Sequence, residues 1–282
     1  MTAVFVVAIV STNNTLKDIA GTIVLAGAGK MGGAMLTGWL AGGLDPKRAV
    51  IVDPYPSDEI RMLATKGVRL NPSNAAAAET LVVAVKPQTF REAGPVLRPF
   101  VGASTLVVSI MAGITIAALA AGCGGSVVRA MPNTPAAVRQ GVTVACPGSG
   151  VAAAQRALCE RLLEAIGVVA FVEDEALLDA VTAVSGSGPA YVFLLAELME
   201  QAAREQGIPP DLARLLARQT VSGSGALLAA STEDAAALRV AVTSPAGTTE
   251  RALSVLMAAD AWPAALSKAI AAATARSREL AG

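Results

Sequence analysis

The sequence predicts an α/β protein with two domains: a parallel, doubly wound sheet domain followed by an all-α domain. Up to about residue 173, short apolar runs of strand type alternate with helical segments, as in a doubly wound sheet. A glycine-rich turn follows the first of these runs, and beyond residue 173 the chain is rich in Ala and Leu with no strand pattern. We therefore expect an N-terminal extension at 1–20, a sheet domain at 21–173 and a helical domain at 174–282.

The individual elements follow from the apolar runs and the residues that interrupt them. The strand runs are short and almost wholly apolar, which is typical of strands buried on both faces of a parallel sheet. A first helix is expected over 31–40, because Gly42 and Gly43 stop it. The expected strands are residues 23–26, 49–54, 80–87, 104–113, 126–132, 141–147 and 167–173, and the helical half is expected to break at 185–190, 207–211 and 244–249.

The composition narrows the class of protein. Hydrophobic residues make up 54% and charged residues 16%, so the chain can bury a large core and keep apolar surface for a partner subunit. The formal net charge is zero, and no basic patch points to nucleic acid. The apolar run at 3–10 is too short to span a bilayer and lacks a basic segment before it. It indicates an extension, with a signal peptide as the alternative, and we expect no membrane partner.

Three isolated cysteines and the absence of histidine limit the chemistry. Cys123, Cys146 and Cys159 form no CxxC pair and are odd in number, which is typical of reduced thiols in a cytoplasmic protein. Zinc and other transition-metal sites use His and clustered Cys as ligands. The sequence therefore predicts no metal site.

The stretch "GAGKMG" carries the first functional signal. It gives Gly27-x-Gly29-x-x-Gly32 between a strand and a helix, which is the fingerprint of a Rossmann-type domain. The first glycine permits the tight turn, the second lets the backbone approach a pyrophosphate, and the third permits close packing of helix on strand. The helix N-terminus presents free N–H groups to the anion. We expect the loop Gly27, Ala28, Gly29, Lys30, Met31 and Gly32 to bind NADPH or NADH, the alternative being an incidental glycine turn.

Asp53 bears on the choice of cofactor. It lies 21 residues past Gly32, at the end of the second strand, where a carboxylate can accept hydrogen bonds from the ribose of NAD. The same charge would repel the 2′-phosphate of NADP, so the residue favours NADH. The alternative is that Asp53 caps the turn before Pro54.

Six stretches occur together in an order that resembles one enzyme family. They are "GAGKMG", "VVAVKPQ", "VVSIMAGI", "VRAMPNTPAAV", "AVSGSGPAYVF" and "VTSPAGTTERAL". Over about residues 22–278 the chain resembles pyrroline-5-carboxylate reductase, the last enzyme of proline biosynthesis. The resemblance implies a homodimer built through the C-terminal helices, and a larger ring of dimers in many members. "MPNTP" and "SPAGTT" are more specific than the glycine motif.

The resemblance also implies roles for individual residues. Thr249 matches the position whose hydroxyl lies near the ring nitrogen of the substrate, and the loop at 244–249 holds the substrate carboxylate through backbone N–H groups. One departure is Ala246, where the family usually has glycine; if the position needs a positive φ, alanine costs about 1 kcal/mol. The implied cofactor contacts are Val85, Lys86, Pro87, Ala112, Gly113 and Asn133, and the implied substrate contacts are Ser187, Gly188, Ser244, Ala246, Gly247, Thr248 and Thr249.

Plainer interpretations stay open for several of these residues. For Lys86, the alternative to cofactor contact is a catalytic role. For Asn133, the alternative to a contact at the edge of the cofactor is stabilisation of a turn. The hydroxyls of the 244–249 loop have helix capping as their alternative. The stretch "SGSGPA" is a helix break, with or without close approach of the backbone to substrate.

The implied reaction is hydride transfer from NAD(P)H to the C=N carbon of 1-pyrroline-5-carboxylate, giving L-proline. A cyclic imine is basic enough to bind already protonated, so the lack of histidine presents no obstacle; Thr249 would orient the nitrogen. Three rivals remain: a reductase of another cyclic imine, a 3-hydroxyacid-type dehydrogenase, and a non-catalytic dinucleotide sensor. The second is disfavoured because Lys268 is the only lysine in the C-terminal helices.

Overall fold

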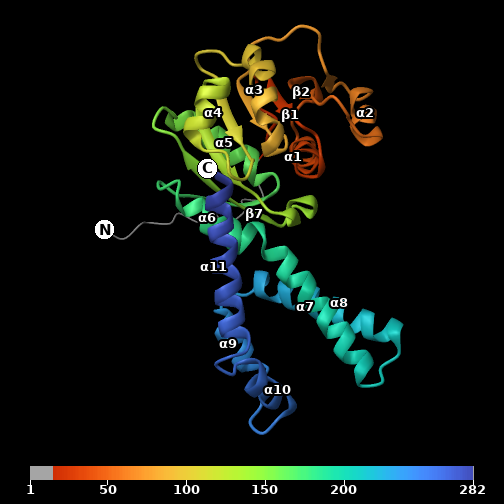
Figure 1. The fold of residues 1–282 in the computed structure, drawn as a ribbon. Helices are drawn as coiled ribbons and strands as arrows, with labels where there is room; N and C mark the ends of the chain where they lie inside the picture. The colour runs from red at the N-terminus through yellow and green to blue at the C-terminus, as the bar shows by residue number, and fades with distance from the viewer. Residues whose placement is uncertain (1–14, 282) are drawn as a thin grey trace. The chain divides into compact units, whose positions relative to one another are not determined.

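The computed structural model describes residues 15–281 (Figure 1). The expectation for the apolar run at 3–10, and most of the expected extension, lie outside the described residues. The chain divides into two compact units. One comprises the residues up to Gly186 together with those from Ala273 onward, and the other comprises Ser187–Ala272. The boundary drawn from the sequence, after residue 173, precedes this division.

The first unit contains an eight-stranded, mostly parallel sheet with the order β3-β2-β1-β4-β5-β6-β7-β8. This arrangement confirms the predicted Rossmann-type fold. β3 is only two residues long, so it gave no apolar pattern in the sequence. The strands are β1 (Ile23–Ala26), β2 (Ala49–Val52), β3 (Arg69–Leu70), β4 (Thr80–Val83), β5 (Leu106–Ser109), β6 (Ser126–Met131), β7 (Gly141–Pro147) and β8 (Gly167–Phe171).

One strand pairing differs from the parallel sheet that the sequence predicts. β7 pairs with β6 in the antiparallel sense, with Arg129 opposite Cys146. Parallel neighbours need a crossover of a dozen or more residues, usually a helix. The link between β6 and β7 holds only a short 3-10 helix, Thr134–Val138, so the chain turns back beside the strand it has just left.

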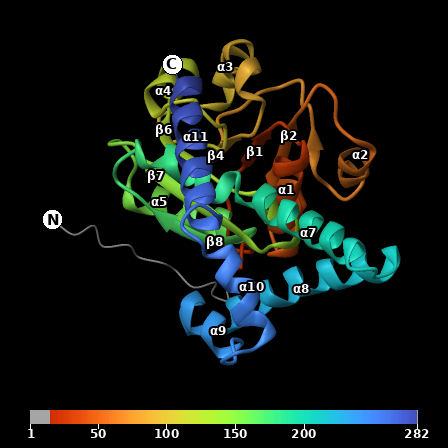
Figure 2. The same ribbon diagram turned by 60° about the horizontal axis from the view of Figure 1, so that its bottom comes forward.

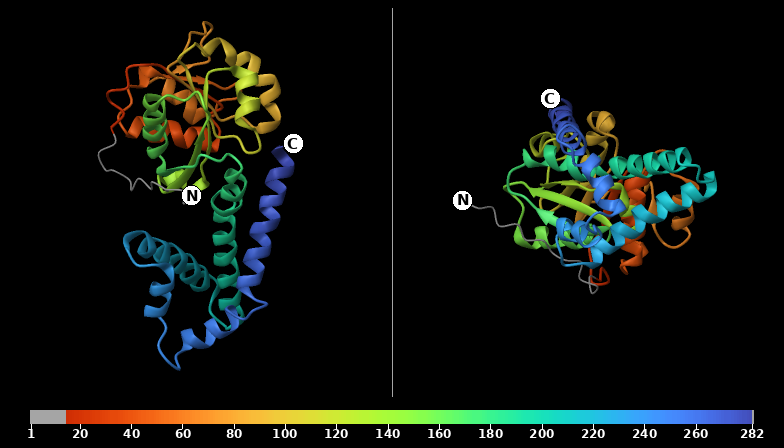
Figure 3. Two further views of the ribbon diagram at one scale, coloured as in Figure 1. Left: turned by 90° about the vertical axis from the view of Figure 1, so that its left-hand side faces the viewer. Right: turned by 90° about the horizontal axis from the view of Figure 1, so that it is seen from below.

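Alternating residues of the strands face two separate cores. Ile23 and Leu25 belong to a cluster that includes buried residues of α1 and α5, whereas Val24 and Ala26 belong to a cluster that includes α3 and α4. Helices therefore cover both faces, α3 and α4 on one side and α1 and α5 on the other (Figure 3, left). The helices of this unit are α1 (Lys30–Ala41), α2 (Asp58–Ala64), α3 (Phe90–Leu97), α4 (Ile116–Cys123), α5 (Ala153–Glu164) and α6 (Leu177–Val181).

The predicted helix breaks have distinct structures. At 185–190 a π-helical turn, Thr182–Gly186, leads into α7. At 207–211 α7 gives way to α8, which begins at Pro210, and at 244–249 a turn separates α9 from α10. The C-terminal helices are α7 (Gly188–Glu205), α8 (Pro210–Ala230), α9 (Ala235–Ala241), α10 (Thr248–Leu256) and α11 (Trp262–Ala281).

The second unit consists of helices only. α7 and α8 form a hairpin and pack side by side (Figures 1 and 2). Among the described residues of this unit, only Ala213 and Ala217 are buried hydrophobic side chains. Large apolar side chains stay exposed instead, such as Phe193 at 67% and Leu215 at 61%. This unit thus has no hydrophobic core of its own in the single chain.

Candidate active site

The three motif glycines meet three different structural demands. Gly27 has φ +86°, and a Cβ there would lie 2.7 Å from the carbonyl oxygen of Ala84. A Cβ at Gly32 would lie 2.1 Å from the carbonyl oxygen of Gly27, so only glycine allows α1 to start this close to β1. A Cβ at Gly29 would meet nothing within 4 Å. The fold does not require glycine at that position, whereas a ligand that approaches the backbone does.

The start of α1 fits an anionic ligand. Gly29 is the N-cap and supplies no side-chain cap, so the first N–H groups of α1 have no side-chain acceptor from that residue. Lys30, the first helical residue, is exposed, and Met31 packs against the core. A pyrophosphate is the group that such a turn and helix N-terminus accept. The residues present therefore fit a dinucleotide.

The loops after β1, β4, β5 and β6 share one edge of the sheet, since these strands run parallel. The strand order reverses direction between β1 and β4, and ligands of open α/β sheets bind outside the carboxyl ends at such a point. The predicted turns at 85–87 and 112–113 follow β4 and β5 and therefore lie along this edge.

Each of these turns has its own local cause. Lys86 is exposed after β4, and Pro87 opens a short 3-10 helix, Pro87–Thr89. Gly113 has φ +75°, and a Cβ there would lie 3.0 Å from the carbonyl oxygen of Leu280. The positive φ thus favours glycine at 113, and a Cβ there would also be crowded by the last turn of α11.

Asn133 follows β6 and is 9% exposed. Its side-chain oxygen accepts a hydrogen bond from the N–H of Val142 at 2.9 Å, and it does not cap the adjacent 3-10 helix. The side chain therefore fixes the start of β7 against the loop at 131–135, a role that the sequence did not indicate.

Asp53 is half-buried and holds two backbone groups. One carboxylate oxygen accepts a hydrogen bond from the N–H of Ala28 at 2.7 Å, and the other accepts one from the N–H of Tyr55 at 2.8 Å. The second bond is the turn-capping role that was the alternative for this residue. The first bond was not foreseen, and it links the end of β2 to the glycine loop.

The predicted substrate loop lies in the helical unit, where it forms a tight turn before α10. Ala246 has φ +57°, in the left-handed region, so alanine stands at a position that favours glycine. The N–H of Gly247 donates to the carbonyl oxygen of Ser244 at 3.0 Å, and the N–H of Ala246 donates to the Glu250 carboxylate at 2.8 Å. The turn is thus held by its own backbone and by one carboxylate from the next helical turn.

The hydroxyls of this loop are not used for capping. Gly247 is the N-cap of α10 and has no side chain to offer. In the described part of the chain, the hydroxyls of Ser244, Thr248 and Thr249 make no hydrogen bond. Thr249 is half-buried in the first turn of α10. The N–H groups of this first turn lack intrahelical acceptors, as in any helix.

Ser187 and Gly188 open α7. Ser187 is the N-cap without a side-chain cap, and a Cβ at Gly188 would meet nothing within 4 Å. The surrounding fold requires neither serine at 187 nor glycine at 188, and in this respect the two positions resemble Gly29.

A groove of about 650 Å³ also lies on this unit, and Ser187 and Gly188 do not line it. Its lining mixes acidic and basic side chains. The lining residues are Phe193, Ala196, Glu197, Glu200, Gln201, Arg204, Arg214 and Arg218.

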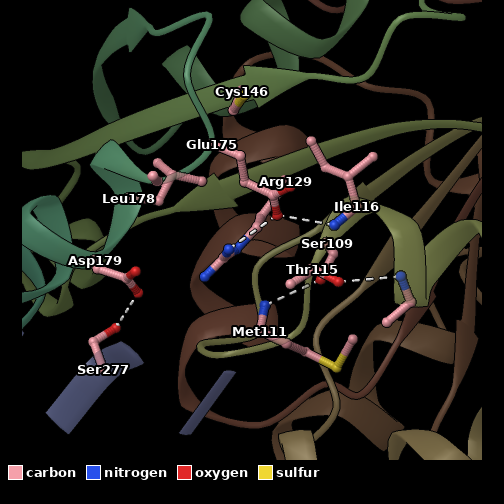
Figure 4. Close-up of polar contacts among 12 residues, drawn as sticks. Ser109, Met111, Thr115, Ile116, Arg129, Cys146, Glu175, Leu178, Asp179 and Ser277 are labelled. Carbon is pink, nitrogen blue, oxygen red and sulfur yellow. Dashed lines mark hydrogen bonds and ion pairs between the residues drawn. The ribbon is translucent and has the colours of Figure 1, made fainter. Parts of the chain in front are cut away.

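A buried ion pair supports the sheet unit and was missed from the sequence (Figure 4). Arg129 on β6 is 3% exposed and donates from Nη1 to Glu175 Oε1 at 3.0 Å. The same Glu175 oxygen accepts from the N–H of Ile116 at 2.9 Å, so it connects β6 to the start of α4. Beside it, Ser277 donates to Asp179 at 2.7 Å and ties α11 to α6. The only hint in the sequence was one arginine within an apolar strand run.

The cysteines offer no nucleophile. All three are buried and unpaired by disulfides. Burial raises the pKa of Cys146 to about 11 and that of Cys159 to about 12, so both stay thiols at neutral pH. Among residues 15–281, no group of three His, Cys, Asp or Glu side chains could hold a metal ion.

Two family models match separate parts of the chain. A family model described as pyrroline-5-carboxylate reductase dimerisation matches residues 175–280, and one described as NADP oxidoreductase coenzyme F420-dependent matches residues 22–113. The chain is 39% identical to the pyrroline-5-carboxylate reductase of Pseudomonas aeruginosa, across 92% of this chain and 96% of that protein.

Two solved structures resemble the whole chain. The pyrroline-5-carboxylate reductase of Coxiella burnetii superposes with a TM-score of 0.84 at 33% identity, over 93% of this chain and 99% of that one. The pyrroline carboxylate reductase of Plasmodium falciparum, solved with NADP bound, gives 0.77 at 26% identity, with the same coverage. The fold and the order of its two units are those of these enzymes.

Proposed function

The chain belongs to the pyrroline-5-carboxylate reductase family, and from that premise we propose how its residues reduce 1-pyrroline-5-carboxylate to L-proline with NAD(P)H. One observation carries the assignment of roles: each unit has a turn at a helix N-terminus with groups that the described fold does not use. The first is Gly29 before α1, and the second is the 244–249 turn before α10. No contact requires glycine at position 29, and the hydroxyls of the 244–249 turn make no hydrogen bond within the described residues.

The turn before α1 is proposed to hold the cofactor. The N–H groups of Gly29, Lys30 and Met31 donate to the pyrophosphate oxygens, because a negatively charged group is stabilised at a helix N-terminus. The turns at 85–87 and 112–113 and Asn133 line the same sheet edge and flank the nicotinamide. When bound, the reduced nicotinamide supplies the hydride. The protein's part is to orient it.

The turn before α10 is proposed to hold the substrate. Its carboxylate accepts hydrogen bonds from the N–H groups in the first turn of α10, at Thr248 and Thr249, with Ser244 beside it. Ser187 and Gly188 give further room for close approach. Thr249 hydrogen-bonds the ring nitrogen and fixes its orientation. A protonated cyclic imine takes up a hydride at carbon without a proton being delivered at that step, so a weakly acidic threonine hydroxyl suffices. Fixing donor and acceptor in contact provides most of the rate.

The chain forms an oligomer, since residues 175–280 match a dimerisation domain. We propose a homodimer through the C-terminal helices, with rings of dimers as a further level. The exposed apolar side chains of α7 and α8 support it, because an obligate interface resembles a domain core cut in half. By length and composition alone, the continuous helical stretch Leu177–Glu205 would also suit a membrane span. A dimer interface accounts for the same apolar surface.

Reduced, buried cysteines support a cytoplasmic location.

The test is oxidation of NADH and of NADPH, followed at 340 nm, with 1-pyrroline-5-carboxylate and with a six-membered cyclic imine. We expect oxidation that requires the five-membered imine and produces proline. Turnover confined to the six-membered imine would overturn the substrate assignment, and cofactor binding without turnover on either imine would favour a sensor. Light scattering tests the dimer: a stable monomer at micromolar concentration would contradict it.

A further inference from the structure

The end of β2 carries a hydrogen-bonded cluster that the reaction as described does not use. Asn71, just after β3, donates from its side-chain nitrogen to the carbonyl oxygen of Asp53 at 2.7 Å. Its side-chain oxygen accepts from the N–H of Asp53 at 2.9 Å. One amide side chain thus holds both backbone groups of Asp53. The N–H of Asn71 in turn donates to the carbonyl oxygen of Ile51 at 2.8 Å.

Asn71 adopts an unusual backbone conformation to do this. Its φ is +44°, in the left-handed region that Asn tolerates better than other non-glycine residues. Asn combines that tolerance with a side-chain amide, which can both donate to and accept from a neighbouring peptide unit. Glycine shares the tolerance but has no side chain. The strained turn and the double hydrogen bond point to a fixed position for Asp53.

The Asp53 carboxylate faces the glycine loop. It accepts from the N–H groups of Ala28 and Tyr55, which occupy two of about four lone-pair positions on a carboxylate. Two positions remain for donors from a ligand. Among the ion pairs formed by residues 15–281, none involves Asp53. A ligand group at this place therefore meets a negative charge that no cation neutralises.

We propose that Asp53, held in place by Asn71, makes this chain selective for the dinucleotide with a free ribose 2′-hydroxyl, NADH over NADPH. This rests on the proposed cofactor site and deepens it. Ribose hydroxyls are donors and suit the two remaining acceptor positions. A 2′-phosphate brings like charge to the carboxylate, and at close range that repulsion corresponds to roughly tenfold or more in affinity. Asn71 is the positioning residue, since it acts on the cofactor through its two side-chain hydrogen bonds to Asp53.

The experiment measures binding, so it does not depend on turnover. Dissociation constants for NADH and NADPH are determined on the full chain by nicotinamide fluorescence, without imine. The variants are Asp53→Asn, which removes the charge and keeps the shape, and Asn71→Gly, which keeps the positive φ and removes the amide. Asp58→Asn is the control: it removes one fully exposed negative charge from the start of α2 without touching the glycine loop. Thermal midpoints are measured for all four proteins.

We expect the wild type and Asp58→Asn to bind NADH at least roughly tenfold more tightly than NADPH. Asp53→Asn should bring the two constants together, chiefly through tighter NADPH binding. Asn71→Gly should reduce the preference several-fold with a thermal midpoint near that of the wild type. Equal or tighter binding of NADPH by the wild type would overturn the proposal, and so would an unchanged ratio in Asp53→Asn. A wild-type ratio in Asn71→Gly would remove Asn71 from it. Failure to reduce the imine would bear on the proposed reaction and leave these binding ratios intact.

Discussion

Replacing Glu175 by alanine tests the buried ion pair most directly. The change removes the acceptor of Arg129 Nη1 and of the Ile116 N–H in one step. Arg129 is only 3% exposed, and its Nε and Nη2 atoms already lack partners in the described structure. The variant leaves a buried guanidinium with no acceptor for any of these three nitrogens. Removing one partner of a buried ion pair costs about 3–5 kcal/mol of unfolding free energy.

The reciprocal substitution should cost much less. In Arg129→Met, the Glu175 side chain keeps the Ile116 N–H as a donor and, at 30% exposure, reaches water. Methionine fills a similar volume and removes two buried donors that had no partner. We expect a loss of about 1–2 kcal/mol, that of an incompletely satisfied acceptor. The double variant should therefore be more stable than Glu175→Ala alone, because the buried charge is gone.

The measurement is chemical unfolding followed by the fluorescence of Trp39, a fully buried residue of the sheet unit. All variants are compared at one protomer concentration, because dimerisation adds to apparent stability. Equal losses for the two single variants would refute the asymmetry. A double variant that loses the sum of both would show that Arg129 and Glu175 are not coupled.

Three further predictions concern single sites. At pH 8 the native chain should resist iodoacetamide, because burial raises the pKa of Cys146 to about 11 and that of Cys159 to about 12, and thiolate forms only as the pH approaches those values. Denaturant should expose all three cysteines to labelling. Rapid labelling of any cysteine in the native chain, detected by mass spectrometry, would contradict this. Ala246→Gly relieves a left-handed alanine, worth about 1–2 kcal/mol, but adds about 0.4–1 kcal/mol of unfolded-chain entropy, so chemical unfolding should show a small gain in stability and not a loss. Thr249→Ala should lower kcat roughly tenfold, the equivalent of one hydrogen bond, with cofactor binding intact, while Thr249→Ser keeps the hydroxyl and most of the rate; an unchanged kcat in Thr249→Ala would exclude the residue from the mechanism.

The sheet domain could be predicted from the sequence because its strands and glycine loop are each recognisable within a few consecutive residues. The expected strand at 23–26 and β1 coincide, and the glycine loop follows it directly. Gly27 and Gly32 illustrate why such a motif can be interpreted. Both are forced by contacts within the same strand–turn–helix unit or with the neighbouring strand, so their spacing records the geometry.

The sequence-based prediction was wrong or incomplete where the structure depends on the length of a connection or on a very short strand. The antiparallel β7 depends on the length of a link, since its apolar run looks the same in either direction. β3 is too short for any periodicity, yet it brings Asn71 next to Asp53. Without β3, Asp53 had only two interpretations, ribose acceptor or turn cap. Its bond to Ala28 is a third role, compatible with both.

Arg129 and Glu175 show where sequence patterns stop giving information. They lie 46 residues apart, and neither has a spacing or neighbour that indicates a partner. What the sequence does contain is a charged side chain within a strand run that must be buried on both faces. Because a buried charge requires a counter-charge and acceptors, that arginine predicts that a partner exists even though it cannot say which. Of the acids just after β8, Glu175 is the one whose oxygen accepts from Arg129 and also from the first N–H of α4. Its identity depends on how α4 and α6 pack, and that information lies in the fold rather than in any local stretch of the chain.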